Sequence, residues 1–376
     1  MFLEKDELYR IRASRTLNKK FLMFTIHSTD TWETLYMPAG SPQSKPKMFL
    51  PREKKHKYDV DHREGLFYIR TNKDAKNFRV VTAPEADPSL AKWKPFIAHR
   101  DNVLIENIEL FEKYAVSMEK TNAVNQIAIY SFDEKSWHSI QFPEEVYSAA
   151  PSQNVDYKSQ VLRYNYQSMI TPSSVYDYDM KSRKAALLKR QEVLGGYDPA
   201  LYESKRLWAL ARDGVKVPVS IVYRKGFKRD GSAPMLLYAY GSYGFGMAAS
   251  FSSSRLTMLD RGLSFAIAHI RGGDEMGEKW HDDGMLMNKK NTFNDFVDCA
   301  AFLISDKWTN KNRLAIEGGS AGGLLMGAVV NQRPDLFRAV HTAVPIVDVM
   351  NTMMDASLPL TVGEYLEWGN PNDKAS

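Results

Sequence analysis

Short apolar strands recur at a regular interval in the first half of the chain. Four segments rich in aromatic and aliphatic residues begin at residues 20, 65, 113 and 160, a period of 45 to 48 residues. Each precedes a polar turn and a second alternating strand. A period near 45 with several short strands per unit is typical of propeller blades, because each small sheet buries its faces only against its neighbours. The sequence therefore predicts four blades over residues 1–183, and an ordinary β-sandwich with accidental spacing is the alternative.

Beyond residue 183 the pattern changes to strands that alternate with helices. Residues 181–202 look like a linker, and the turn dipeptide Asp213-Gly214 then joins two strands of a β-hairpin. Near-continuous apolar runs, of the kind buried in a parallel sheet, alternate with segments of helical periodicity. We expect strands at 234–240, 263–269, 313–317 and 339–345, and helices at 291–306 and 321–332. This order predicts a doubly wound α/β sheet over residues 184–376.

Composition supports a globular chain with two domains and excludes several other classes. The 376 residues are 44% hydrophobic and 25% charged, with a net charge of +5. The longest apolar run, at 323–330, is far shorter than the roughly 18 residues of a membrane helix, so we expect no membrane span. The basic cluster at 45–57 lacks interleaved stacking aromatics, so we expect no nucleic-acid partner.

The single cysteine and the first residues bear on the compartment. Cys299 permits neither an internal disulfide nor a thiolate metal site, and its neighbours Phe296, Val297 and Ala300 are apolar. We therefore expect a buried structural thiol in a reducing compartment. The acidic start has no signal-like apolar core. A cytoplasmic location is the prediction, and a periplasmic one is the alternative if a signal has been lost upstream.

The candidate chemistry lies between a predicted strand and a predicted helix. Residues 318–322, Gly-Gly-Ser-Ala-Gly, match the G-x-S-x-G pattern of a nucleophile elbow in the context that this motif requires. A sharp turn there exposes the Ser320 hydroxyl, and the Ala321 N–H at the helix start could stabilise an oxyanion. One alternative is a serine that only caps the helix. Another is a phosphate-binding loop, but such a loop has a lysine beside the serine, and no lysine lies beside Ser320.

A second glycine-rich loop could supply another oxyanion donor. Residues 239–246 read Ala-Tyr-Gly-Ser-Tyr-Gly-Phe-Gly and follow the predicted strand at 234–240. Glycines allow close approach to a substrate, and the Tyr240 hydroxyl could donate a hydrogen bond from its side chain. The plain alternative is a flexible loop with packed aromatic residues.

Together with further motifs, these residues resemble the prolyl oligopeptidase family of serine peptidases, most closely its oligopeptidase B branch. The motifs that carry the resemblance lie at 212–219, 238–244, 269–273, 289–296, 318–323 and 367–371. The resemblance implies an α/β-hydrolase domain capped by a seven-bladed propeller, of which this chain would hold about four blades. It also implies cleavage of short peptides, with the propeller as a size filter, and no metal or organic cofactor. By position, Ser320 would be the nucleophile, Tyr240 the hydroxyl donor of the oxyanion hole and Ala321 its backbone donor.

The chain departs from the family pattern after Ser320. In α/β hydrolases an Asp and then a His follow the nucleophile on late loops, yet only 56 residues follow it here. The one later histidine, His341, falls in an apolar segment and is predicted to be a core residue, and Asp348 comes earlier than the family's acid. We therefore expect a fragment that lacks both ends of the family fold and shows little peptidase activity alone, because Ser320 has no general base.

A second departure concerns specificity. Oligopeptidase B cleaves after Arg or Lys, and its selective acids lie in a G-E-x-E stretch; here residues 363–368 read Gly-Glu-Tyr-Leu-Glu-Trp. Glu364 matches the first acid, Leu366 replaces the second, and Glu367 lies one position later. We predict substrate binding by Glu364 and Glu367 and a preference for Arg or Lys, weakened by the missing carboxylate; a surface acid pair is the alternative. A non-catalytic scaffold, an acylaminoacyl or dipeptidyl peptidase and a small-ester hydrolase also stay open.

Overall fold

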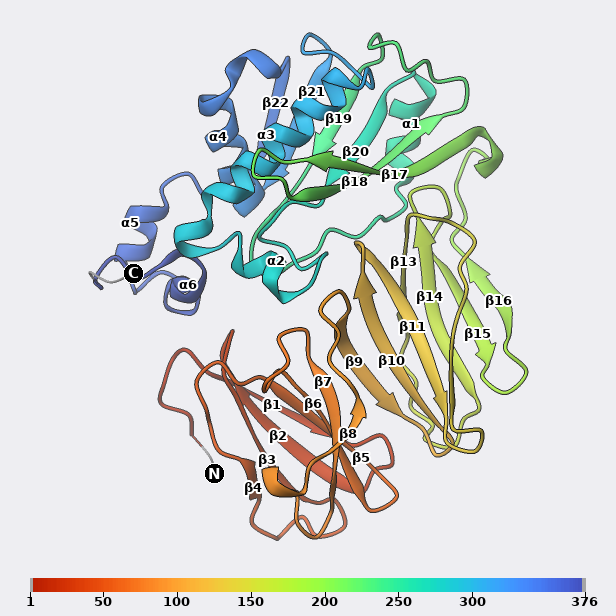
Figure 1. Ribbon diagram of the computed structural model, residues 1–376, viewed down its shortest axis with the longest axis vertical. Helices are drawn as coiled ribbons and strands as arrows, with labels where there is room; N and C mark the ends of the chain where they lie inside the picture. Colours follow the sequence, from red (N-terminus) through yellow and green to blue (C-terminus); the bar gives the residue numbers. More distant parts are fainter. Residues whose placement is uncertain (1–2, 374–376) are drawn as a thin grey trace.

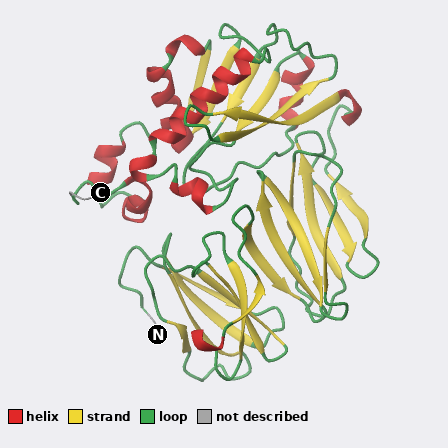
Figure 2. Ribbon diagram, in the orientation of Figure 1, coloured by secondary structure: helices red, strands yellow, loops and turns green. Residues whose placement is uncertain are grey.

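In the computed structural model, which describes residues 3–373, four small antiparallel sheets are followed by one six-stranded mixed sheet with helices around it (Figures 1 and 2). The partial propeller and the partial α/β-hydrolase domain that the sequence predicts are both present. Across the described residues, no helix is long and apolar enough to cross a membrane.

Each of the four blades in the described residues contains four strands in sequence order. The second strand of each blade, β2, β6, β10 or β14, is one of the four periodic segments. The first and the fourth strands of the blades were not predicted. The strands are β1 Arg10–Arg15, β2 Phe21–His27, β3 Trp32–Pro38, β4 Lys47–Leu50, β5 Tyr58–Arg63, β6 Leu66–Thr71, β7 Arg79–Pro84, β8 Lys94–Ile97, β9 Leu104–Leu110, β10 Tyr114–Thr121, β11 Val124–Ser131, β12 Ser136–Ser139, β13 Tyr147–Pro151, β14 Val161–Ser168, β15 Ser174–Asp179 and β16 Lys184–Arg190.

Buried aromatic and aliphatic side chains hold each blade against the next. One cluster joins blades 1 and 2, where the rings of Phe21 and Phe67 lie 5.1 Å apart. Another joins blades 2 and 3, near Phe96 and Tyr130, whose rings lie 5.4 Å apart. A third cluster joins blades 3 and 4. Each blade must present a similar packing surface to the next blade, which explains why the repeats have nearly the same length.

The segment predicted to be a linker contains a strand of the propeller. Strand β16 lies in the segment predicted to be a linker, yet it pairs with β15 as the outermost strand of blade 4. All seven of its residues are exposed, so its sequence, Lys-Ala-Ala-Leu-Leu-Lys-Arg, lacks the alternation that marks a half-buried strand. Blade 4 therefore extends to Arg190.

The second domain is built on a sheet with the strand order β17-β18-β20-β19-β21-β22, in which the last four are parallel. Its strands are β17 Tyr202–Leu210, β18 Lys216–Arg224, β19 Met235–Tyr238, β20 Ser264–Ala268, β21 Leu314–Gly319 and β22 Ala339–Ala343. Its α-helices are α1 Ser253–Asp260, α2 Glu278–Asp282, α3 Lys290–Ser305, α4 Ala321–Gln332, α5 Val349–Met354 and α6 Thr361–Trp368. Short 3-10 helices are η1 Leu90–Lys92 in the propeller, and η2 Pro199–Leu201, η3 Leu286–Asn288 and η4 Pro334–Leu336 here.

Helices cover both faces of this sheet, as a doubly wound fold requires. Ala266 and Ala268 of β20 belong to the core beneath α3 and α4, whereas Phe265 and Ile267 belong to the core beneath α1. Successive side chains of a strand point to opposite faces, so a strand buried on both sides reads as a continuous apolar run. Cys299, on α3, is fully buried in the first of these cores, as predicted.

Polar contacts join the propeller to the second domain. Lys57 lies 2.8 Å from Glu278, and Lys120 lies 2.7 Å from Asp274. The Ala123 N–H donates to the Glu275 carbonyl at 3.0 Å. Blades 2 and 3 therefore contact the segment that enters α2.

His341 is not a core residue, so that prediction is wrong. Strand β22 is the edge strand of the sheet over the described residues, and four of its five residues are exposed. The His341 side chain is 68% exposed and its Nδ1 lies 3.3 Å from Glu317. An apolar strand sequence indicates a buried position, but it does not reveal which strand lies at an edge.

Candidate active site

Ser320 occupies a strained turn between β21 and α4. Its φ of 55° and ψ of −117° lie in a region that residues with a side chain rarely adopt. The Ser320 N–H donates to the Ala343 carbonyl at 2.9 Å, and the Ser320 carbonyl accepts from the Gly323 N–H at 2.9 Å. Although Ser320 is the N-cap residue of α4, its side chain makes no capping hydrogen bond. The hydroxyl is therefore not used to hold the helix.

Two glycines let the chain pass through this turn. A Cβ on Gly318 would lie 2.3 Å from the Gly322 carbonyl oxygen, and a Cβ on Gly322 would lie 2.9 Å from the Ala239 carbonyl oxygen. Backbone atoms cannot move aside cheaply, so the strand, the helix and the end of β19 meet only because both positions lack side chains.

Tyr240 reaches this turn from the loop after β19. Its hydroxyl interacts with the Ser320 side chain. Burial raises the pKa of Tyr240, and the interaction with Ser320 opposes that rise. The phenol therefore stays protonated at neutral pH and keeps a proton to donate. Ala321, the first residue of α4, is buried, and the first N–H groups of a helix have no intrahelical acceptor.

The loop that carries Tyr240 packs tightly against residues 269–284 and the start of α3. Gly241 has a φ of 72°, and a Cβ there would lie 2.6 Å from the Thr292 side chain. A Cβ on Gly272 would lie 2.1 Å from the Gly241 carbonyl oxygen. The backbone on either side of Tyr240 thus has little room to shift.

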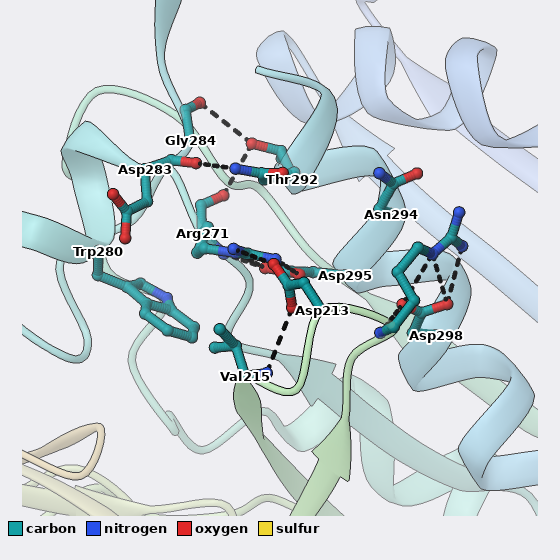
Figure 3. A network of polar contacts seen from close by, with 12 residues as sticks. Asp213, Val215, Arg271, Trp280, Asp283, Gly284, Thr292, Asn294, Asp295 and Asp298 are labelled. Atoms are coloured by element: carbon teal, nitrogen blue, oxygen red, sulfur yellow. Dashed lines mark hydrogen bonds and ion pairs between the residues drawn. The ribbon is translucent and has the colours of Figure 1, made fainter. Parts of the chain in front are cut away.

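A buried ion-pair network stabilises that supporting segment (Figure 3). The Arg271 guanidinium donates to Asp295 through Nε at 2.8 Å and Nη2 at 2.5 Å, and Nη1 lies 2.7 Å from Asp213. Thr292 donates to the Arg271 carbonyl at 2.8 Å. Burial raises the pKa of Asp295, and the bonds from Arg271 oppose that rise. A two-pronged buried pair fixes its geometry closely, so this network is a rigid base beneath the Tyr240 loop.

Glu364 and Glu367 lie on α6 but face different surroundings. Glu364 lines a cavity of about 510 Å³ between the first blade and the second domain, together with Glu7 and His27. One of its oxygens accepts from the Tyr243 hydroxyl at 3.1 Å.

Glu367 is 3% exposed, and both of its carboxylate oxygens have protein partners. One accepts from the Tyr243 N–H at 2.9 Å, and the other lies 2.7 Å from His281 Nε2. Of the two acids, Glu364 is thus the one that borders the cavity, whereas Glu367 ties α6 to the Tyr240 loop and to α2.

Comparison with known proteins identifies the family. Residues 1–191 match the prolyl oligopeptidase N-terminal β-propeller domain, and residues 249–376 match the prolyl oligopeptidase family. The chain belongs to the prolyl oligopeptidase family. It is 44% identical over 376 residues to dipeptidyl aminopeptidase BI of Pseudoxanthomonas mexicana, covering 100% of this chain and 52% of that protein. It is 35% identical to protease 2 of Moraxella lacunata, covering 99% of this chain and 53% of that protein.

Solved structures of this family confirm the expected likeness to oligopeptidase B. Oligopeptidase B from Trypanosoma brucei with covalently bound antipain matches with a TM-score of 0.93 and 37% identity, over 99% of this chain and 54% of that one. The Leishmania major enzyme matches with a TM-score of 0.93 and 36% identity, over 99% of this chain and 53% of that one. The chain spans about half the length of the relatives that it matches.

A serine nucleophile needs a general base such as histidine, and the described part of the chain gives Ser320 no histidine as a hydrogen-bond partner. The Nδ1 of His341 instead lies within ion-pair distance of Glu317. Asp348 caps α5, where it accepts from the Asn351 N–H at 3.1 Å, and its hydrogen bonds with Asn351 lower the pKa of Asp348. Neither residue serves Ser320 in this structure.

A buried serine–histidine–acid arrangement lies elsewhere in the domain and was not predicted. Ser220 Oγ lies 2.6 Å from His269 Nε2, and His269 Nδ1 lies 3.3 Å from Glu275. All three side chains are buried, and burial lowers the pKa of His269. No substrate could reach this serine, so the arrangement supports the fold. Sequence spacing gave no signal for it, since the three residues come from separate segments.

Proposed function

We propose that this sequence is part of a serine peptidase that hydrolyses short peptides through an acyl-enzyme on Ser320. The proposal concerns a polypeptide of the length of the relatives that contains this chain. The observation that carries it is the strained turn at Ser320, where the hydroxyl makes no capping bond and interacts with Tyr240.

The roles follow from the chemistry of acyl transfer. Ser320 Oγ attacks the peptide carbonyl carbon, and the carbonyl oxygen gains negative charge as the tetrahedral intermediate forms. The Tyr240 hydroxyl and the Ala321 N–H are the donors that we assign to this oxyanion. One such donor contributes about 3–4 kcal/mol to the transition state. The Ser320 proton passes to the general base of the longer polypeptide, which gives it to the amine nitrogen as the C–N bond breaks and the amine leaves. Water, deprotonated by the same base, then hydrolyses the ester, and the proton returns to Ser320 Oγ.

A fluorophosphonate probe tests the nucleophile. In the polypeptide of full family length, we expect the probe to label Ser320 and to leave the Ser320→Ala variant unlabelled. An unlabelled Ser320 in folded protein would favour the non-catalytic scaffold and overturn the proposal.

We also propose that the 376-residue chain alone has little activity. A serine hydroxyl is a poor nucleophile at neutral pH without a general base, and Ser320 has no histidine partner within the described residues. The measurement is hydrolysis of an arginyl ester by the purified chain. Turnover at a rate close to that of the longer polypeptide would contradict this expectation.

For the substrate we propose a preference for Arg or Lys on the acyl side of the cleaved bond. Glu364 supports it, because its carboxylate borders the cavity and one oxygen is already oriented by Tyr243. Leu366 removes a second carboxylate, so we expect the preference to be weak. Matched Arg, Lys and Pro reporter peptides measure it, and a preference for Pro would overturn the assignment of Glu364.

A second candidate is removal of dipeptides from a free amino terminus. The relative with 44% identity carries the name dipeptidyl aminopeptidase BI, which favours this alternative. Reporter peptides with a free or an acetylated amino terminus distinguish the two. We expect restriction to short peptides by the propeller in either case. The cytoplasm is the compartment that we propose, from the single buried thiol.

A further inference from the structure

The ammonium group of Lys289 lies directly beside the loop that carries Tyr240. Lys289 is the N-cap residue of α3, and its Nζ donates to the Gly241 carbonyl at 2.6 Å and to Ser242 Oγ at 2.6 Å. The same Nζ lies 4.9 Å from the centre of the Trp368 ring on α6. This one side chain thus joins α3, α6 and the peptide that follows Tyr240.

The surroundings of this cation are unusual for a structural lysine. Within residues 3–373, no ion pair joins Lys289 to a carboxylate, and both of its acceptors are uncharged. Burial lowers the pKa of Lys289 to about 8, with the charge of Glu367 opposing that fall. A half-buried cation without a close counter-ion costs stability that an apolar side chain of similar length would avoid. Packing alone therefore does not account for the charge.

The acceptor of Lys289 is the backbone that sets the direction of Tyr240. The Gly241 carbonyl oxygen lies against Gly272, where a Cβ would be only 2.1 Å from it. Loss of the ammonium would leave this carbonyl and Ser242 Oγ without their donor, in a place where Ser242 is fully buried. A small displacement of a catalytic donor is costly, since about 1 Å of misplacement can reduce a rate about a hundredfold.

We propose that Lys289 is a positioning residue that holds the Gly241–Ser242 peptide so that the Tyr240 hydroxyl points at the oxyanion, and that its positive charge favours the charged transition state. This inference rests on the proposed function. It predicts that the protonated amine is the active form.

Titratable groups on the neighbouring elements bear on the pH dependence. Glu364 and Glu367 lie on α6, His281 lies on α2, and Tyr240 and Tyr243 lie on the loop itself. Burial raises the pKa of both tyrosines, so they lose their protons at higher pH than Lys289 does. His281 lies beside Glu367 rather than beside the amine. Among these groups, Lys289 is expected to control the alkaline side of the kcat profile.

Three variants in the polypeptide of full family length separate charge from packing. Lys289→Gln keeps an N–H donor without the charge, and we expect kcat to fall about tenfold while KM stays within about twofold. Lys289→Arg keeps the charge, and we expect kcat within about threefold of the wild type. The kcat of the wild type should decline above about pH 8. In Lys289→Arg this decline should move upward by at least about one pH unit, and in Lys289→Met it should be absent.

The exposed neighbour Lys290 supplies the control, because Lys290→Gln removes the same charge one position away and should leave the profile unchanged. If Lys289→Gln lowers the midpoint of urea denaturation but keeps the wild-type kcat and alkaline decline, Lys289 is only structural and the inference is overturned. An unlabelled wild-type Ser320 in the fluorophosphonate experiment would overturn the proposed function, and this inference with it. A labelled, active wild type with an unaffected Lys289→Gln variant overturns this inference alone.

Discussion

Replacement of Tyr240 by Phe removes one hydroxyl and leaves the aromatic packing in place. The Tyr240 ring lies 5.8 Å from Phe245 and 6.2 Å from Tyr243, centre to centre, and Phe retains both contacts. The change in the free energy of unfolding should therefore be small, at most about 1 kcal/mol for the lost interaction with Ser320. The transition state, by contrast, loses one of the two donors assigned to the oxyanion. We expect kcat to fall about 100- to 1000-fold, with KM little changed.

The assay is steady-state hydrolysis of a short arginyl reporter peptide by the polypeptide of full family length. Tyr223→Phe is the matched control, since it removes a hydroxyl from a buried tyrosine on β18 in the same domain. A fall in kcat of less than about threefold for Tyr240→Phe would refute the assignment. So would a large rise in KM at unchanged kcat, because that result would place the hydroxyl in ground-state binding.

Three further predictions concern stability. Gly322→Ala places a methyl carbon 2.9 Å from a backbone oxygen, so it should lower the free energy of unfolding by about 1–3 kcal/mol, measured by urea denaturation. Gly327→Ala is the control: a Cβ at Gly327 would have nothing within 4 Å, so this variant should not lower the free energy of unfolding. Asp295→Asn removes the buried carboxylate that pairs with Arg271 and should lower the free energy of unfolding by about 3–5 kcal/mol, measured in the same way. A decrease below about 1 kcal/mol would refute a stabilising role for the network. Burial raises the pKa of Asp61 to about 7, so the native protein holds this proton more tightly than the unfolded chain, and stability should fall as the pH rises from about 4 through 7. Asp61→Asn should therefore unfold at higher urea than the wild type at pH 8, with the difference vanishing near pH 4.

The fold could be predicted from the sequence wherever the signal is local and repeated. The blades share one length because each packs on its neighbour, and the helix at 321–332 was predicted with its observed limits. The turn at Ser320 was found because the glycines that it needs for close approach, Gly318 and Gly322, are themselves the motif.

Positions that depend on distant partners could not be predicted. Burial of a strand depends on which other strands cover it, so His341 was misplaced and β16 was missed. The Arg271–Asp295 pair and the contact of Lys289 with Gly241 each join segments about 20 or more residues apart. Such pairs follow from the packed structure, and no local pattern of charges indicates them.

The buried side chains of Ser220, His269 and Glu275 give any covalent labelling experiment an internal reference. The protein holds one serine at an accessible strained turn and another with an imidazole 2.6 Å away but no route for a reagent. A probe that distinguishes them reports on access and on backbone strain, and not on the mere nearness of an imidazole. Labelling of Ser220 would therefore signal that the domain had opened.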